Sequence, residues 1–280
     1  MFRHSVPTAS SGYAFAWAIV LAGAFSTLPT ASLAQASPER LSDKEVKTII
    51  EDLDTARDKF EGNLDNDVKR AIIRTPTREV AASAVLQDLQ DNTKKLKERF
   101  TSDYAASAEV ETVLQQATSI ANYMKTGASG AKGRSEWEKL SADLTVLAGA
   151  YGTTFPLPVG ATVRRMNDNE AGAAADALAK AADEYKDKVD EHDGKLSPAD
   201  EATGKKTADD LAEAAKTLRS RVSDGKPSTA EAKHVVQLAS ALSAFNVAHP
   251  VPAAQASWAS VQSSLAKIEQ AFGMVPTPMR

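Results

Sequence analysis

Histidines are the first residues to test for metal or acid–base chemistry, and only three lie beyond residue 40. Glu231 and His234 have the Glu-x-x-His spacing that puts two ligands on one helix face in di-iron bundles. Such a site needs a second copy of the motif, and the sequence has none. His192 lies in a Glu-His-Asp-Gly run typical of a turn, and His249 directly precedes a proline. We therefore predict no metal site and no cofactor.

The sequence also lacks the motifs that activate a nucleophile or hold a phosphate. It contains no Gly-x-Ser-x-Gly and no Ser-x-x-Lys with its usual companions. The glycine-rich segment 127–133 resembles a phosphate loop, but it follows a predicted helix and lacks the Gly-Lys-Ser/Thr ending. We interpret it as a flexible connector, and we predict that the protein is not an enzyme.

Aromatic and basic side chains give the candidate binding residues. Trp137 and Trp258 occupy equivalent places in two similar stretches, where they could line matched pockets or fill the ends of two cores. Their positions on apolar stripes favour the core. Between these stretches, Phe155 and Leu157 lie close to Arg164 and Arg165, and apolar anchors beside guanidinium groups are typical of interfaces. The alternative is that this linker packs against the rest of the chain.

The elements that carry these residues are predicted to be helices. Large apolar residues alternate at spacings of three and four from Trp137 to Tyr151 and again from Trp258 to Phe272, and a glycine follows each run. This is the pattern of an amphipathic helix with a C-terminal glycine cap. The two tryptophans are 121 positions apart, and Asp43 is matched by Asp168 at a similar distance. We therefore predict an internal duplication.

Four helices are expected in each half. Capping-box spacing is found at Ser42, Ser135 and Ser228, and Ser197-Pro198 provides a cap followed by a first-turn proline. No segment is predicted as a strand. The fold class is therefore all-α, with two tandem antiparallel four-helix bundles; a continuous α-solenoid is the alternative. The predicted divisions are 1–34 (signal peptide), 41–152 (first bundle), 153–167 (linker), 168–273 (second bundle) and 274–280 (tail).

The two predicted cores differ in their side chains. The first helix of the second half is rich in alanine, where the first half has valine, isoleucine, leucine and phenylalanine. An alanine face buries less apolar area per turn, and each Å² of buried apolar area contributes about 25 cal/mol to stability. We therefore expect the second half to unfold first.

The N-terminal segment predicts export. Arg3 is followed by the apolar run 14–25 and by small residues, with possible cleavage after Ala34 or Ala36. Removal of residues 1–34 leaves 32 basic and 37 acidic residues, a mild negative charge that argues against nucleic-acid binding. The chain has no cysteine, so disulfides and thiolate metal sites are excluded. We expect a periplasmic or secreted protein with no membrane span after cleavage.

These features together predict a non-catalytic interaction or scaffold module of the bacterial envelope. Its partner is expected to be a protein or a peptide, because long helix faces with coiled-coil-like spacing offer extended surfaces. The alternative is a small-ligand carrier or sensor with a pocket in a bundle core.

Overall fold

The computed structural model describes residues 39–75, 78–126, 132–191 and 196–279, and most of them are helical. The predicted signal peptide, His192 and most of the glycine-rich connector lie outside these ranges. Within them, no helix combines the length and the apolar character that a bilayer crossing requires.

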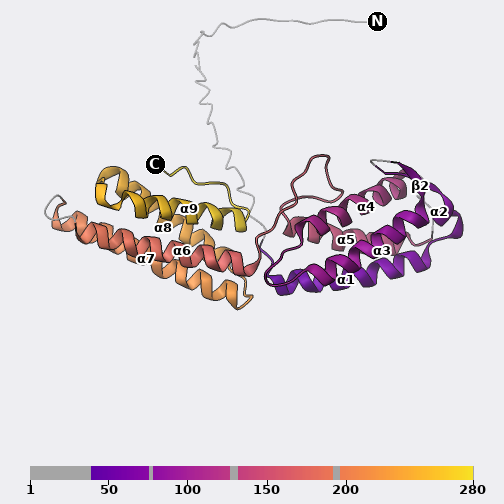
Figure 1. The fold of residues 1–280 in the computed structure, drawn as a ribbon, viewed down its shortest axis with the longest axis horizontal. Coiled ribbons are helices and arrows are strands. Elements are labelled where there is room, and N and C mark those ends of the chain that lie inside the picture. The colour runs from indigo at the N-terminus through magenta and orange to yellow at the C-terminus, as the bar shows by residue number, and fades with distance from the viewer. Residues whose placement is uncertain (1–38, 76–77, 127–131, 192–195, 280) are drawn as a thin grey trace, which may run out of the picture. The chain divides into compact units, whose positions relative to one another are not determined.

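The first half forms a closed group of four long helices around one core (Figure 1). The first of these helices contacts the second and the fourth, and the third contacts both of those as well. This closed arrangement is that of a bundle and not of an open solenoid. The four helices are α1 (Asp43–Asn63), α3 (Ala82–Arg99), α4 (Ser107–Thr126) and α5 (Arg134–Ala150), and the short α2 (Asn66–Arg70) follows α1.

The second half repeats this arrangement around a separate core. Its first helix contacts the second and the fourth, and its third helix again contacts both of those. The all-α prediction is therefore confirmed. The four long helices are α6 (Asp168–Asp190), α7 (Pro198–Ser223), α8 (Thr229–Ala248) and α9 (Gln255–Ala271), with the one-turn 3₁₀ helix η1 (Pro252–Ala254) before the last.

One segment differs from the prediction, because a small antiparallel hairpin lies between α2 and α3. Strand β1 (Ile72–Arg74) pairs with β2 (Glu79–Ala81), with Ile73 opposite Val80. The expectation that no strand forms was therefore wrong, and α3 begins directly after β2, at Ala82. Two successive β-branched residues favour the extended conformation, and burial of Ile73 in the first core holds the strand in place.

The helix ends confirm some of the predicted caps and correct others. Ser42 forms a complete capping box with Glu45, and the Ser197 side chain caps α7. The glycines after α5 and α9, Gly152 and Gly273, have φ of 70° and 59°, as the predicted left-handed caps require.

The other two predicted capping boxes do not form. Helix α5 starts one residue early, at Arg134, and Gly133 precedes it with no side-chain cap. Ser228 also makes no capping hydrogen bond. At α8, the Glu39 carboxylate accepts the Thr229 N–H at 3.2 Å, while Glu231 pairs with Arg221 at 2.8 Å. Both predicted caps were wrong: at α8 other parts of the chain bind these groups, and at α5 the helix already begins before Ser135.

Candidate functional site

Two short segments with the same pattern meet immediately before α1 and α6. Residues 40–45 read Arg-Leu-Ser-Asp-Lys-Glu, and residues 165–170 read Arg-Met-Asn-Asp-Asn-Glu. In each segment, the third residue caps the helix and the sixth closes a capping box. The arginine and the aspartate of both segments therefore occupy the same places relative to a helix N-terminus.

These segments bind each other reciprocally. The Asp43 N–H donates to Asp168 Oδ2 at 2.8 Å, and the Asp168 N–H donates to Asp43 Oδ2 at the same distance. Arg40 donates to Asp168 Oδ1 at 2.6 Å, and Arg165 donates to Asp43 Oδ1 at 2.8 Å. We call these four residues the clasp. Each half gives to the other the same contacts that it receives, as in a two-fold symmetric interface.

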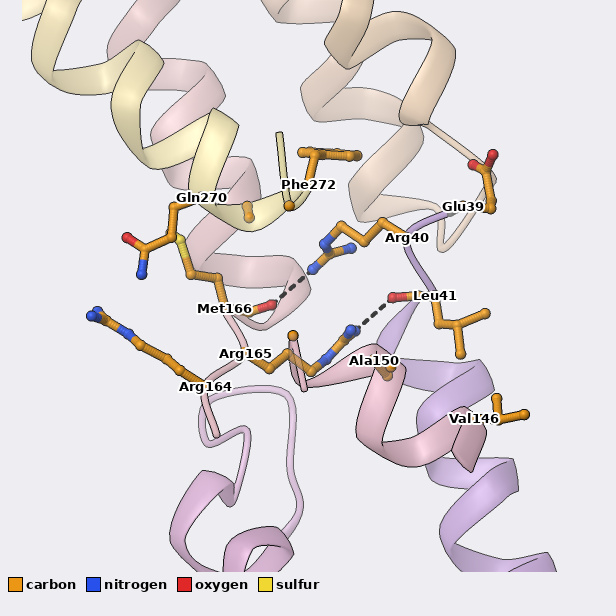
Figure 2. Close-up of a pocket in the computed structure, with 14 residues that line it drawn as sticks. Glu39, Arg40, Leu41, Val146, Ala150, Arg164, Arg165, Met166, Gln270 and Phe272 are labelled. Atoms are coloured by element: carbon orange, nitrogen blue, oxygen red, sulfur yellow. Dashed lines mark hydrogen bonds between the residues drawn. The ribbon is translucent and has the colours of Figure 1, made fainter. Parts of the chain in front are cut away.

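Two further hydrogen bonds extend the same symmetry to the backbone. Arg40 Nη2 donates to the Met166 carbonyl at 2.9 Å, and Arg165 Nη2 donates to the Leu41 carbonyl at 2.7 Å (Figure 2). Leu41 and Met166 are themselves equivalent positions in the two segments. The reciprocal pattern therefore covers side chains and main chain alike.

Because the clasp is buried, its stability depends on all four of its residues. The side chains of Arg40 and Arg165 are only 6% and 3% exposed, and those of Asp43 and Asp168 are 14% and 16% exposed. Both oxygens of each aspartate accept a hydrogen bond within the clasp. A buried charge is tolerated when its partners are complete, and removal of one partner leaves the other charge uncompensated. Burial lowers the pKa of Arg40, and repulsion from Arg165 lowers it further.

A cavity of about 320 Å³ lies beside the clasp. Its charged lining consists of Arg40, Arg164, Arg165 and Glu39, and the guanidinium of Arg40 stacks over the Phe272 ring at 5.5 Å. The remaining lining is mostly apolar or glycine. These residues are Leu41, Val146, Gly149, Ala150, Gly152, Met166, Gln270, Ala271, Phe272 and Gly273.

Several residues that line this cavity are at equivalent positions in the two halves, and some of these pairs differ chemically. Ala150 matches Ala271, whereas Gly149 is matched by Gln270 and Glu39 by Arg164. Figure 2 shows Arg164 and Gln270 on one side of the cavity, with Leu41, Val146 and Ala150 on the other. Arg164 and Gln270 are therefore polar groups on one side, and Leu41, Val146 and Ala150 form an apolar patch on the other, with Arg40 and Glu39 next to Leu41.

The predicted site residues divide into three groups. Arg164 and Arg165 both line the cavity, the first exposed and the second buried in the clasp. Phe155 and Leu157 are half-buried against the first core, where the Phe155 ring lies 6.4 Å from that of Trp137. The linker thus packs against the chain at these two residues.

The tryptophans are buried in separate cores. Trp137 is 8% exposed and lies 5.2 Å from Phe60, whereas Trp258 is 5% exposed and lies 6.0 Å from Tyr185. These distances join ring centroids, and the two pairs are at equivalent positions. The tryptophans fill matched places in the two cores, as their positions on the apolar stripes predict.

Arg40, Phe272 and the contact between Asp43 and Asp168 are not among the site residues predicted from the sequence. The signal was present, because Arg40 precedes Arg165 by the same 125 positions that separate the two aspartates. The reciprocal pairing itself is not visible in the sequence, because it depends on how the two segments meet.

Two of the three histidine candidates, His234 and His249, lie within the described residues. His234 is exposed in a groove between α7 and α8, together with Asp210 and Glu213. Among the residues that the structure describes, no group of three or more His, Asp and Glu side chains is placed to hold a metal ion.

Comparison of this chain with protein-family models, with curated proteins and with solved structures gives no match. The functional argument therefore rests on the cavity and the clasp themselves.

Proposed function

We propose that the protein is an exported, non-catalytic helical module that binds a protein or peptide partner at the cavity beside the clasp. The single observation that supports this proposal is the composition of that cavity. It combines apolar side chains with arginines that are already held in position, and both kinds of residue contribute strongly to protein interfaces.

The cavity is preformed in its charged part. Arg40 and Arg165 are fixed by the clasp, so a ligand does not have to order them. An ordered side chain saves roughly 0.5–1.5 kcal/mol of entropy that binding would otherwise cost. At the rim, the Val146 side chain is 48% exposed and provides apolar surface next to the arginines.

Site-specific photocrosslinking in the cells that make the protein tests this proposal. p-Benzoylphenylalanine at position 146 is expected to give a discrete adduct with a partner. The matched control places it at position 247, because Val247 in α8 is 57% exposed and lies outside the cavity lining. Equal adducts from both positions, or none from position 146, would refute binding at the cavity.

The proposed export is tested at the N-terminus of the protein. Cleavage of the signal peptide predicts a mature chain that begins at Gln35 or Ser37 in the envelope or the medium. Mass spectrometry of the purified protein measures this directly, and an intact N-terminus would contradict the proposal.

A small-ligand carrier is the second candidate, because a volume of about 320 Å³ is at the lower end of the range of ligand pockets. The cavity lies at the junction of the halves and not in a bundle core, where the sequence analysis placed it. A ligand-dependent rise in melting temperature, together with the absence of a protein adduct at position 146, would favour this candidate.

We also infer that the two halves derive from an internal duplication. The equal helix order, the matched tryptophan pairs and the reciprocal clasp support this inference. A clasp with two-fold reciprocity is the contact expected if the ancestral unit formed a symmetric dimer.

A further inference from the structure

We propose that the cavity beside the clasp binds a carboxylate that carries an apolar group, such as the carboxyl terminus of a protein that ends in an aliphatic residue. This inference rests on the proposed function and names the chemistry that the cavity recognises.

Unused hydrogen-bond donors in a buried arginine are the first observation. Arg165 donates to Leu41 and Asp43 through Nη2, and its Nε is buried without a hydrogen-bond partner among the described residues. The Nε of Arg40 is also buried and has no hydrogen-bond partner among the described residues. A guanidinium has five N–H donors and no acceptor, so an anionic oxygen is the group that satisfies it.

The charge that faces the cavity is the second observation. Three arginines line it, and Glu39 is the one acid in that lining. The Glu39 carboxylate is engaged by the Thr229 N–H at 3.2 Å. Asp43 and Asp168 already accept hydrogen bonds on both oxygens, so they have little left to offer the cavity. The clasp aspartates neutralise Arg40 and Arg165, so the attraction for an anion comes from the exposed Arg164 and from the unused Nε donors.

The positions of Arg164, Gln270 and an apolar patch in this lining give the ligand an orientation. Arg164 and the Gln270 amide lie on one side, and both can donate hydrogen bonds to a carboxylate (Figure 2). Leu41, Val146 and Ala150 lie opposite and offer contacts to an aliphatic group. Glycine at position 149, where the other half has glutamine, leaves the apolar side free of a long polar side chain.

The size of the cavity limits what enters it. A volume of about 320 Å³ is enough for a carboxylate and one medium-sized aliphatic side chain. The rest of a peptide would continue outward past the exposed Val146. A carboxyl terminus meets these requirements, because it joins a carboxylate and a side chain at one carbon atom.

Calorimetric titration of the purified full-length mature chain with three probes tests this inference. The probes are acetyl-Ala-Ala-Leu as the free acid, the same peptide as its C-terminal amide, and 4-methylpentanoate. We expect the free acid to bind at least about tenfold more tightly than the amide, because the amide lacks the charge that strengthens hydrogen bonds to a guanidinium. Equal affinity of the free acid and the amide, or no binding of any probe, would overturn the proposal.

An exposed arginine gives a variant that is expected to leave the fold intact. Arg164→Gln is expected to weaken binding of the free acid by about tenfold. Lys180→Gln makes the same change of charge at an 80% exposed side chain in α6, outside the cavity lining, and is expected to leave binding unchanged. Equal effects of the two substitutions would show that net charge alone acts, and the inference would fail.

The arms of this experiment separate the possible sources of the carboxylate. If 4-methylpentanoate binds as tightly as the peptide acid, the carboxylate chemistry is supported and a free acid is the ligand. An adduct at position 146 that persists when every probe fails to bind would leave the proposed function in place and remove this inference alone.

Discussion

The two halves of the chain have the same helix arrangement, but different side chains form their cores. The first core contains Phe60 and Trp137, and the linker adds Phe155 as a third ring. In the second core, α6 contributes six buried alanines in place of most of the larger residues of α1, although Tyr185 and Trp258 retain the aromatic contact. One arrangement of four helices therefore tolerates either close approach of small faces or wider packing of large ones.

The buried tyrosines show the same exchange on a smaller scale. Tyr151 in the first half and Phe272 in the second are equivalent, whereas Phe60 in the first half is matched by Tyr185. The Tyr151 hydroxyl donates to the Ala105 carbonyl, and Tyr185 contacts Asn246 Oδ1 at 3.2 Å. The hydroxyl is therefore buried at different places in the two halves, and each finds a local acceptor.

The largest expected effect compares the two cores directly. Leu144→Ala in α5 and Leu265→Ala in α9 remove equivalent buried side chains, and each is expected to cost roughly 2–5 kcal/mol of unfolding free energy. The alanine-rich half is expected to be less stable and to unfold first. Leu265→Ala should therefore lower the midpoint temperature of the first thermal transition of the full chain, and Leu144→Ala should lower that of the second transition. Scanning calorimetry measures both, and identical shifts of one shared transition would contradict separate cores.

The next effect concerns the clasp that both halves share. Asp43→Asn and Asp168→Asn each remove a carboxylate from a buried arginine, and each is expected to cost about 3 kcal/mol. Because the contacts are reciprocal, the two losses should be similar. Urea unfolding of both variants measures them. A large loss for one variant with none for the other would show that the clasp is not symmetric.

A glycine in α7 tests how closely the second bundle is packed. A Cβ at Gly204 would lie 2.4 Å from Phe245 Cζ, so Gly204→Ala is expected to destabilise the second half by about 1–3 kcal/mol. Gly62→Ala in α1 is the matched control, because a Cβ added at this position would have no packing contact within 4 Å. The control should raise stability by roughly 0.5–1 kcal/mol. A stabilising effect at position 204 would mean that the bundle has space there.

The smallest effect is a dependence on alkaline pH. Burial raises the pKa of Tyr185 from 10 to about 12. The native state therefore retains a proton that the unfolded chain releases, so this contribution to stability is complete below pH 10 and is lost as the pH rises towards 12. Tyr185→Phe, which introduces the residue found at position 60, should reduce this alkaline loss in denaturant unfolding. An unchanged pH profile would contradict the assigned burial of the hydroxyl.

The sequence was sufficient to predict the all-helical fold and most helix positions. The stripes of α1, α5 and α9 carry a clear helical period, and Ser42 and Ser197 mark the starts of α1 and α7. The hairpin at Ile72–Ala81 was missed because three-residue strands are too short to show a period. The cap at α8 failed because tertiary contacts compete for Glu231 and Thr229, and the cap at α5 failed because that helix begins one residue before Ser135.

The candidate site was predictable only in part. Arg164 and Arg165 stand out as an adjacent pair of arginines. Arg40 and Phe272 belong to the site because they contact each other although they are more than a hundred residues apart in the sequence. The spacing of apolar residues in the sequence predicts which face of a helix is buried, but it does not predict which helix ends lie next to each other. The cavity exists only because two helix N-termini and two glycine-capped C-termini come together.

Reciprocity at the clasp is the claim on which the account depends, and amide NMR of the full mature chain tests it most directly. The Asp43 N–H bonds to Asp168, and the Asp168 N–H bonds to Asp43. We therefore predict that Asp168→Asn shifts the amide resonance of Asp43, and that Asp43→Asn shifts that of Asp168 by a comparable amount. If each substitution shifts only resonances of its own segment, the two halves do not meet through the clasp.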